Sequence, residues 1–268
     1  MQASLPASAL HTLRLPAPAK LNRLLNIVGQ RVDGYHELQT LFQLIDLCDT
    51  LTFTLRHDGQ LELRDGLTDI PSEGNLVMRA ARLLRNATGC SLGAQLTIED
   101  KRLPMGGGLG GGSSNAATTL LGLNQLWQLG LSFDQLAELG LRLGADVPVF
   151  IHGTSAWAEG VGERLTPVTL DTPWFVVIHP GVSVSTPEVF KDPQLTRNTP
   201  PITMARALQG GASAWRNDCE AGVTRAYPPI AAAMEWLEGF AETHLTGTGA
   251  CIFAGFNSQA IAVDVANQ

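Results

Sequence analysis

The stretch PMGGGLGGGSSNAATTLL, residues 104–121, holds six glycines within seven residues and leads into the polar start of a predicted helix. Glycine loses more conformational entropy on ordering than any other residue, so a folded protein keeps such a run only where something approaches the main chain closely. Free N–H groups at a helix N-terminus, the positive end of its dipole and the hydroxyls of Ser113 and Ser114 suit a phosphate group. The stretch therefore predicts a phosphate-binding loop.

Three other interpretations of this loop fit its context less well. Gly106, Gly108 and Gly111 satisfy GxGxxG, but a dinucleotide fold needs the glycines directly after a strand and an acidic residue about 20 positions later, and residues 101–105 intervene here. No Gly-Lys-Ser or Gly-Lys-Thr follows, which excludes the Walker A loop. A flexible linker would lie between polar segments, whereas this loop lies between Pro104 and a long helix.

Composition restricts the class of protein. The 268 residues are 44% hydrophobic with a net charge of -7 and no run of Lys and Arg, which argues against nucleic-acid binding. Four scattered cysteines and six histidines without a metal-binding spacing predict reduced thiols, a cytoplasmic protein and no protein-only metal site. Residues 103–133 carry no charge, but their glycines and amides favour a buried helix over a membrane span. Pro6 interrupts the start, so we expect no signal peptide.

The order of elements predicts an α+β fold. Residues 50–55 and 59–64 alternate around Asp58-Gly59 and predict a hairpin, while residues 75–86 predict an amphipathic helix that ends near Gly89. A strand over 95–99, a helix to about residue 129, a capping box at Ser132 and Gln135 and a strand over 174–179 follow. A domain boundary is expected around residues 152–160, which divides the chain into residues 1–154 and residues 155–268.

Candidate functional residues lie outside the loop as well. Lys20, among apolar neighbours, is the cation that a phosphate loop without its own lysine needs, although a lysine can also extend to the surface. Lys101 and Arg102 are a second candidate pair. Asp146 follows Gly144 where a helix is expected to end and a negative charge gains no stability, which suggests a functional role. A turn-forming Asp in GADVP is the ordinary alternative, and position alone does not decide between the two.

Several stretches together carry a family resemblance: PAPAKLN, DGYHELQTLFQ, PMGGGLGGGSSNAA, GADVPVF, EGVGERLTPV, HPGVSVSTPEVFKDP, RNDCE and LTGTGAC. From about residue 15 to residue 256 the chain resembles the galactokinase, homoserine kinase, mevalonate kinase and phosphomevalonate kinase superfamily. GYHELQT and GADVPVF point to the branch that phosphorylates 4-diphosphocytidyl-2-C-methyl-D-erythritol in the non-mevalonate isoprenoid pathway. The resemblance implies two α+β domains, an ATP-binding domain over residues 1–154 and a substrate-binding domain over residues 155–268, with the active site in the cleft between them.

The resemblance also implies a reaction and its residues. ATP, carrying Mg²⁺ on its phosphates, would donate its γ-phosphate to the 2-hydroxyl of the substrate. Asp146 would take the hydroxyl proton, and Lys20 would keep Asp146 ionised and offset developing charge. The implied substrate residues are Asn22, Tyr35, His36, Thr186 and Phe190, with Tyr35 and Phe190 sandwiching cytosine and His36 reading its edge. The implied ATP residues are Asn75, Lys101, Pro104, Met105, Gly106, Gly107, Gly108, Leu109, Gly110, Gly111, Gly112, Ser113 and Ser114.

Two departures from the family pattern qualify these expectations. Arg23 stands where the family usually has an apolar residue, so we expect it to point outward or to perturb the site. The family continues beyond the position of Gln268 through the rest of a helix and a last strand, so we expect a packing element to be missing. A kinase of another small alcohol, and a nucleotide-binding regulator without turnover, are the alternative functions.

Overall fold

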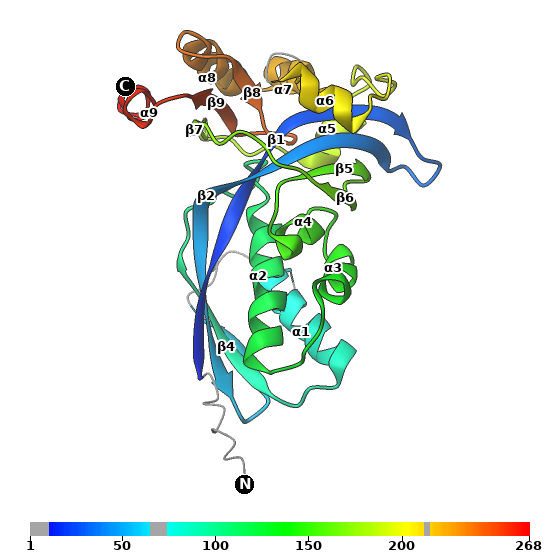
Figure 1. Ribbon diagram of the computed structural model, residues 1–268, viewed down its shortest axis with the longest axis vertical. Helices are drawn as coiled ribbons and strands as arrows, with labels where there is room; N and C mark the ends of the chain where they lie inside the picture. The colour runs from blue at the N-terminus through cyan, green and yellow to red at the C-terminus, as the bar shows by residue number, and fades with distance from the viewer. Residues whose placement is uncertain (1–10, 65–73, 212–214) are drawn as a thin grey trace. The chain divides into compact units, whose positions relative to one another are not determined.

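The computed structural model describes residues 11–64, 74–211 and 215–268 (Figure 1). Its strands are β1 (Thr12–Gln30), β2 (His36–Arg56), β3 (Leu61–Arg64), β4 (Gly93–Asp100), β5 (Ala156–Gly160), β6 (Arg164–Pro167), β7 (Trp174–Ile178), β8 (Thr243–Leu245) and β9 (Ile252–Phe256). Its helices are α1 (Leu76–Thr88), α2 (Gly111–Leu126), α3 (Phe133–Leu141), α4 (Val147–His152), α5 (Thr186–Lys191), α6 (Met204–Gly210), α7 (Glu220–Ala226), α8 (Pro228–Glu238) and α9 (Gln259–Ala266). The predicted α+β class is confirmed.

Two compact units divide the chain, and neither is continuous in sequence. Unit 1 comprises residues 1–17, 48–102 and 112–151, and unit 2 comprises residues 18–47, 103–111 and 152–268. The long strands β1 and β2 each contribute residues to both units. The functional division at residues 154 and 155 stays a prediction.

The β2–β3 connection differs from the hairpin that the sequence predicts, and that prediction is wrong. Strand β4 lies between the two strands, antiparallel to β2 with Leu51 opposite Ile98, and parallel to β3 with Leu61 opposite Ala94. A Cβ at Gly93 would overlap the backbone of Gln60, so glycine lets β4 begin directly against the turn. Alternation showed two strands correctly but could not show which strand pairs with which.

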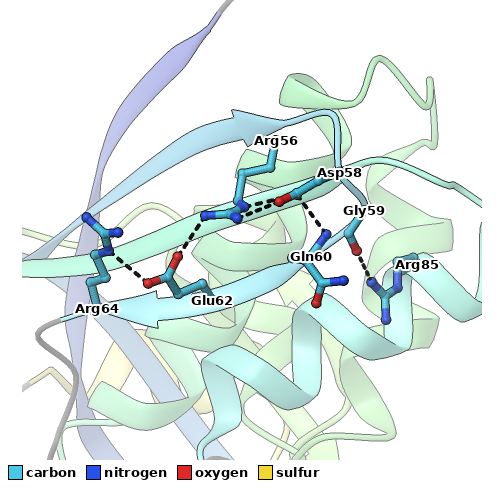
Figure 2. Close-up of polar contacts among 7 residues, drawn as sticks. All are labelled: Arg56, Asp58, Gly59, Gln60, Glu62, Arg64 and Arg85. Carbon is cyan, nitrogen blue, oxygen red and sulfur yellow. Dashed lines mark hydrogen bonds and ion pairs between the residues drawn. The ribbon is translucent and has the colours of Figure 1, made fainter.

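A surface network of ion pairs and hydrogen bonds holds the turn between β2 and β3 (Figure 2). The Arg56 guanidinium pairs with Asp58 at 2.6 Å and with Glu62 at 2.7 Å, and Arg85 of α1 donates to the carbonyl of Gly59 at 2.8 Å. The hydrogen bond from Arg56, together with that from the backbone of Gln60, lowers the pKa of Asp58 to about 2. Because these charges are exposed, the network contributes mainly to the geometry of the turn.

Helices of unit 1 cover one side of the strands β2 and β4 (Figure 1). A Cβ at Gly122 would lie 2.7 Å from the ring of Phe53, so this glycine lets α2 approach β2, and Trp127 donates to the carbonyl of Gly93 at 3.1 Å. Two predicted helix ends are confirmed, because Gly89 caps α1 with a φ of 66° and Ser132 and Gln135 form the capping box of α3. The helix end expected at Gly144 is wrong, because α3 ends at Leu141.

Unit 2 contains a three-stranded antiparallel sheet in the order β7-β9-β8. Its core includes Val176 and Ile252 from this sheet, Val223 and Ile230 from α7 and α8, and Val265 from α9. Cys219 and Cys251 are buried free thiols, and burial raises the pKa of both to about 12. Within the described residues, no helix is both long enough and apolar enough to cross a bilayer.

Candidate active site

The glycine loop, residues 104–111, follows β4 and packs against a second glycine turn, residues 246–251, within unit 2. Gly106, Gly108 and Gly110 have φ values of 66°, 73° and 73°. Backbone N–H groups of Ala250 and Cys251 donate to the carbonyls of Gly106 and Gly107, each at 3.0 Å. The second glycine turn therefore supports the loop through main-chain hydrogen bonds. The glycines are thus needed for close contact with the protein's own chain, whereas the sequence had suggested close contact with a ligand alone.

Gly108 is the tightest point of this packing, and we expect Gly108→Ala to destabilise the protein by about 3 kcal/mol. A Cβ there would overlap the carbonyl oxygen of Thr246 and lie 3.0 Å from that of Gly249, at a φ that alanine rarely adopts. Urea unfolding measures the effect. Gly106→Ala is the matched control, because its φ is 66° but its nearest neighbour would be 3.5 Å away. Equal losses for the two variants would contradict the packing argument.

Lys20 supplies the positive charge that the glycine loop lacks. The side chain lies in β1 at only 3% exposure, and its ammonium donates to the carbonyl of Gly108 at 2.8 Å and to Oδ1 of Asn22. Its backbone N–H also donates to Leu109 at 3.0 Å. The alternative in which Lys20 extends to the surface is therefore excluded, and the loop receives a buried cation from a distant strand.

Asn22 positions this cation. Its Oδ1 accepts from Lys20, while its Nδ2 donates to Thr40 at 2.7 Å, so both ends of the amide are engaged. Its backbone N–H donates to Thr246, whose hydroxyl donates in turn to Gly108 at 3.2 Å. Asn22 thus holds Lys20 in place, and its predicted proximity to substrate stays a prediction.

The first turn of α2 carries buried polar atoms without partners. Ser114 Oγ and Asn115 Oδ1 have no hydrogen bond among the described residues, although these residues are 0% and 4% exposed. Asn115 donates through Nδ2 to Asp49 at 2.9 Å, which leaves its oxygen for another donor or a cation. Both oxygen atoms can accept a hydrogen bond from a further donor.

Buried Asp49 organises the segment that leads to the loop. Its carboxylate pairs with Lys101 at 2.9 Å and accepts from the backbone of Arg102 at 2.8 Å, in addition to the bond from Asn115. Lys101, predicted to lie near adenine, is thus fixed to the same carboxylate as the first turn of α2. Asn75, the other residue predicted near adenine, is the N-cap of α1 and accepts from Val77 at 2.9 Å.

Asp146 lies directly before α4, which the sequence did not predict. The earlier helix α3 ends at Leu141, and α4 begins at Val147 with Pro148 as its second residue. The premise that the Asp146 carboxylate gains nothing from its position is therefore wrong, because an acid at a helix N-terminus is favourable. Its position no longer argues for function, and its catalytic role stays a prediction.

The predicted substrate residues of unit 2 fall into two groups. His36 and Phe190 stack with ring centroids 4.7 Å apart and planes at 21°, while Tyr35 is 64% exposed. Thr186, at the first position of α5, shares a 2.8 Å hydrogen bond with Thr248 of the second glycine turn. The cytosine sandwich stays a prediction, with one face of Phe190 already covered by His36.

Comparison with known proteins decides the family. Residues 75–154 match the GHMP kinases N terminal domain. A 4-diphosphocytidyl-2-C-methyl-D-erythritol kinase of Chromohalobacter salexigens is 63% identical over 92% of this chain and 84% of the relative. The chain belongs to the 4-diphosphocytidyl-2-C-methyl-D-erythritol kinase family. A relative of the same name from Pseudomonas fluorescens is 57% identical over 93% of this chain and 87% of its own length.

Solved structures agree with this membership. A crystal structure of 4-(cytidine 5'-diphospho)-2C-methyl-D-erythritol kinase matches with a TM-score of 0.82 and 33% identity, over 95% of this chain and 94% of the other. A mevalonate kinase matches with a TM-score of 0.69 at 15% identity over 95% and 94%, which shows the shared fold alone. The predicted GHMP kinase fold is confirmed.

Arg23 departs from the family pattern without pointing into solvent, so the first of the two expectations for it is wrong. The residue is 6% exposed, and its guanidinium donates to Gln43 at 2.8 Å and pairs with Asp171. The guanidinium lies 4.1 Å from the ring centroid of Trp215, a cation–π contact. Burial lowers the pKa of Arg23, whereas the hydrogen bond and charge of Asp171 raise it. The Arg23 side chain is thus part of the buried interior beside Trp215.

Several residues of the site escaped the sequence argument because their roles come from distant partners. Asp49 holds Lys101, and Thr246 joins Asn22 to the loop. Asn217, in the RNDCE stretch, donates through Nδ2 to the carbonyls of Leu245 and Gly247 at 2.9 and 2.7 Å, and so fixes the second glycine turn. Asn217 and Thr246 lie in the quoted stretches RNDCE and LTGTGAC, whereas no local pattern marks Asp49.

Proposed function

We propose that this chain transfers the γ-phosphate of ATP to the 2-hydroxyl of 4-diphosphocytidyl-2-C-methyl-D-erythritol. The observation that carries the proposal is the buried Lys20 ammonium on the carbonyl of Gly108, within a chain that belongs to this kinase family. Phosphoryl transfer depends on positioning and electrostatics more than on covalent help from the protein. A fixed cation on a rigid glycine loop supplies both.

The proposed chemistry assigns one role to each charged residue. The carboxylate of Asp146 takes the proton from the 2-hydroxyl, whose oxygen forms a bond to the γ-phosphorus. The bond from that phosphorus to the β,γ-bridging oxygen breaks, and ADP leaves with the electron pair. Lys20 offsets the negative charge that develops during transfer. Asn22 holds the ammonium in its orientation throughout.

The polar atoms at the start of α2 fit a nucleotide phosphate with its cation. Ser114 Oγ and Asn115 Oδ1 are buried without partners among the described residues, and oxygen atoms of this kind suit Mg²⁺. Mg²⁺ on the ATP phosphates neutralises part of their charge. In the part of the chain that the structure describes, no cluster of three or more His, Cys, Asp or Glu is arranged for a metal, so we propose that Mg²⁺ arrives with ATP.

The partner that we propose is therefore a small molecule with a cytidine diphosphate group. ADP release with ATP and Mg²⁺ tests this directly, with mevalonate, homoserine and galactose as competing acceptors. We expect release with the cytidyl substrate alone. Release with another acceptor instead would favour a different kinase of the superfamily, and ATP binding without release from any acceptor would favour the regulatory alternative. Cys90, Cys219 and Cys251 are free thiols, which fit a reducing compartment, and the cytoplasm is our proposal for it.

Phe190→Ala should raise the KM for the cytidyl substrate about tenfold, because stacking of a base on an aromatic ring contributes about 1–3 kcal/mol. The KM for ATP should stay unchanged. Steady-state kinetics measure both constants. Phe133→Ala is the control, since Phe133 is 61% exposed on α3. An unchanged KM for the cytidyl substrate would reject Phe190 as a stacking residue.

A further inference from the structure

Arg197 connects His36 and Phe190 to the loop after α5, and no motif marked it. Its Nε donates to Nε2 of His36 at 3.2 Å. One terminal nitrogen donates to the carbonyls of Phe190 and Asp192 at 2.8 and 2.9 Å, and the other donates to that of Leu195 at 3.2 Å. All three nitrogens of the guanidinium are therefore engaged, and every partner belongs to unit 2.

This geometry fixes the proton on the His36 ring. A guanidinium only donates hydrogen bonds, so Nε2 must accept and cannot carry a proton. Burial and the neighbouring Arg197 charge both lower the pKa of His36, which keeps the ring neutral. The proton of a neutral ring then lies on Nδ1. Since His36 is only 8% exposed, Nδ1–H is a directed donor on a largely buried ring.

We propose that Arg197 is a positioning residue that sets nucleobase specificity by locking His36 with its proton on Nδ1. This inference rests on the proposed function, in which His36 faces the edge of the cytosine. An N–H donor complements N3 of cytosine, which is an acceptor, and opposes N3 of uracil, which carries a hydrogen. A site built around a fixed donor rejects a ligand that leaves it unpaired or faces it with another donor.

The lock also explains why Arg197 bonds to the Phe190 carbonyl. Phe190 stacks on His36, so the base-facing ring, its stacking partner and the donor that orients it are held by one guanidinium. Removing Arg197 would free His36 to move its proton to Nε2, and Nδ1 would then become an acceptor. The altered ring would match uracil N3–H better than cytosine N3.

Arg197→Met is the test variant. We expect its KM for the cytidyl substrate to rise about tenfold, as for loss of one hydrogen bond, with the KM for ATP and kcat within about twofold. The preference for the cytidyl substrate over its uridyl analogue should fall about tenfold or more. Arg225→Met is the matched control, because Arg225 pairs with Asp192 of the same loop at 2.7 Å and bonds neither His36 nor Phe190. It should leave both quantities unchanged.

A double variant separates the effect of Arg197 on the orientation of His36 from its effect on the stability of the fold. In His36→Asn the amide nitrogen can serve as the donor without help from Arg197, so Arg197→Met added to it should change the cytidyl preference by less than about twofold. The ¹⁵N shifts of labelled histidine in the folded full chain report the tautomer directly. We expect a protonated Nδ1 in the unaltered chain and loss of that state in Arg197→Met.

Each result supports or overturns the inference. A protonated Nε2 in the unaltered chain, or the same cytidyl preference in Arg197→Met and Arg225→Met, overturns it while leaving the proposed kinase reaction intact. Absence of turnover of the cytidyl substrate by the unaltered folded chain overturns the proposed function, and this inference with it. If Arg197→Met does not fold by thermal unfolding, Arg197→Lys replaces it, since lysine keeps the charge but cannot make all four bonds.

Discussion

Asp146→Asn is expected to lower kcat about 10²- to 10⁴-fold, the range that a general base contributes. Asparagine keeps the size of the side chain and its hydrogen-bonding oxygen at the start of α4, but it cannot take a proton from the 2-hydroxyl. Binding of ATP and of the cytidyl substrate should change less than about threefold, because the carboxylate acts on the proton in transfer. Single-turnover kinetics and equilibrium binding separate the two effects.

The control for this variant is Asp134→Asn, which alters an acid in the first turn of α3. Loss of its dipole interaction should cost only about 0.5 kcal/mol of stability and leave kcat unchanged. Near-normal turnover in Asp146→Asn would remove Asp146 from the mechanism. Equal loss of turnover and of stability in both variants would indicate a structural effect instead.

Lys20→Met should lower kcat about 10²- to 10³-fold, the effect of removing one positioned donor from a transition state. Methionine fills a similar volume at this 3% exposed position, but the carbonyl of Gly108 and Oδ1 of Asn22 lose their donor. We also expect a higher KM for ATP, because the glycine loop loses its buried cation. Initial rates over a range of ATP concentrations give both constants.

Arg14→Met is the matched control, since Arg14 is a cation of the same strand β1 whose side chain is 65% exposed in its pair with Glu99. Its loss should change neither constant. If Lys20→Met kept kcat within about twofold of the unaltered chain, Lys20 would be a structural lysine and the proposed role of its charge would be wrong. Unfolding in urea shows whether stability alone changed.

The helices and their ends could be predicted because their signals are local. Asn75 and Gly89 limit α1, and Ser132 with Gln135 starts α3, through bonds between residues a few positions apart. Strand pairing depends on residues far apart in the sequence, so alternation around Asp58 indicated two strands but missed β4 between them. The helix that begins after Asp146 was not predicted, because α4 has only six residues and therefore no periodic pattern.

The candidate site divides in the same way. The glycine loop and Lys20 could be predicted because a run of glycines and a lysine among apolar residues are both unusual and both visible in the sequence. The partners that orient them could not: Thr246 and Asn22 are 224 positions apart, and Arg197 and His36 are 161 apart. Arg23 illustrates the limit, since nothing in KLNRLLNI shows that Trp215 and Asp171 would enclose its charge.

The most direct test of the central claim is ³¹P NMR of the product formed from ATP and 4-diphosphocytidyl-2-C-methyl-D-erythritol. Phosphorus on the tertiary 2-oxygen has no carbinol proton to couple with, so we predict one new phosphomonoester singlet that appears in step with ADP. A proton-coupled doublet would place the phosphate on a secondary hydroxyl, and a triplet would place it on a primary one. Either multiplet, or the absence of any new monoester signal from folded protein, would contradict transfer to the 2-oxygen.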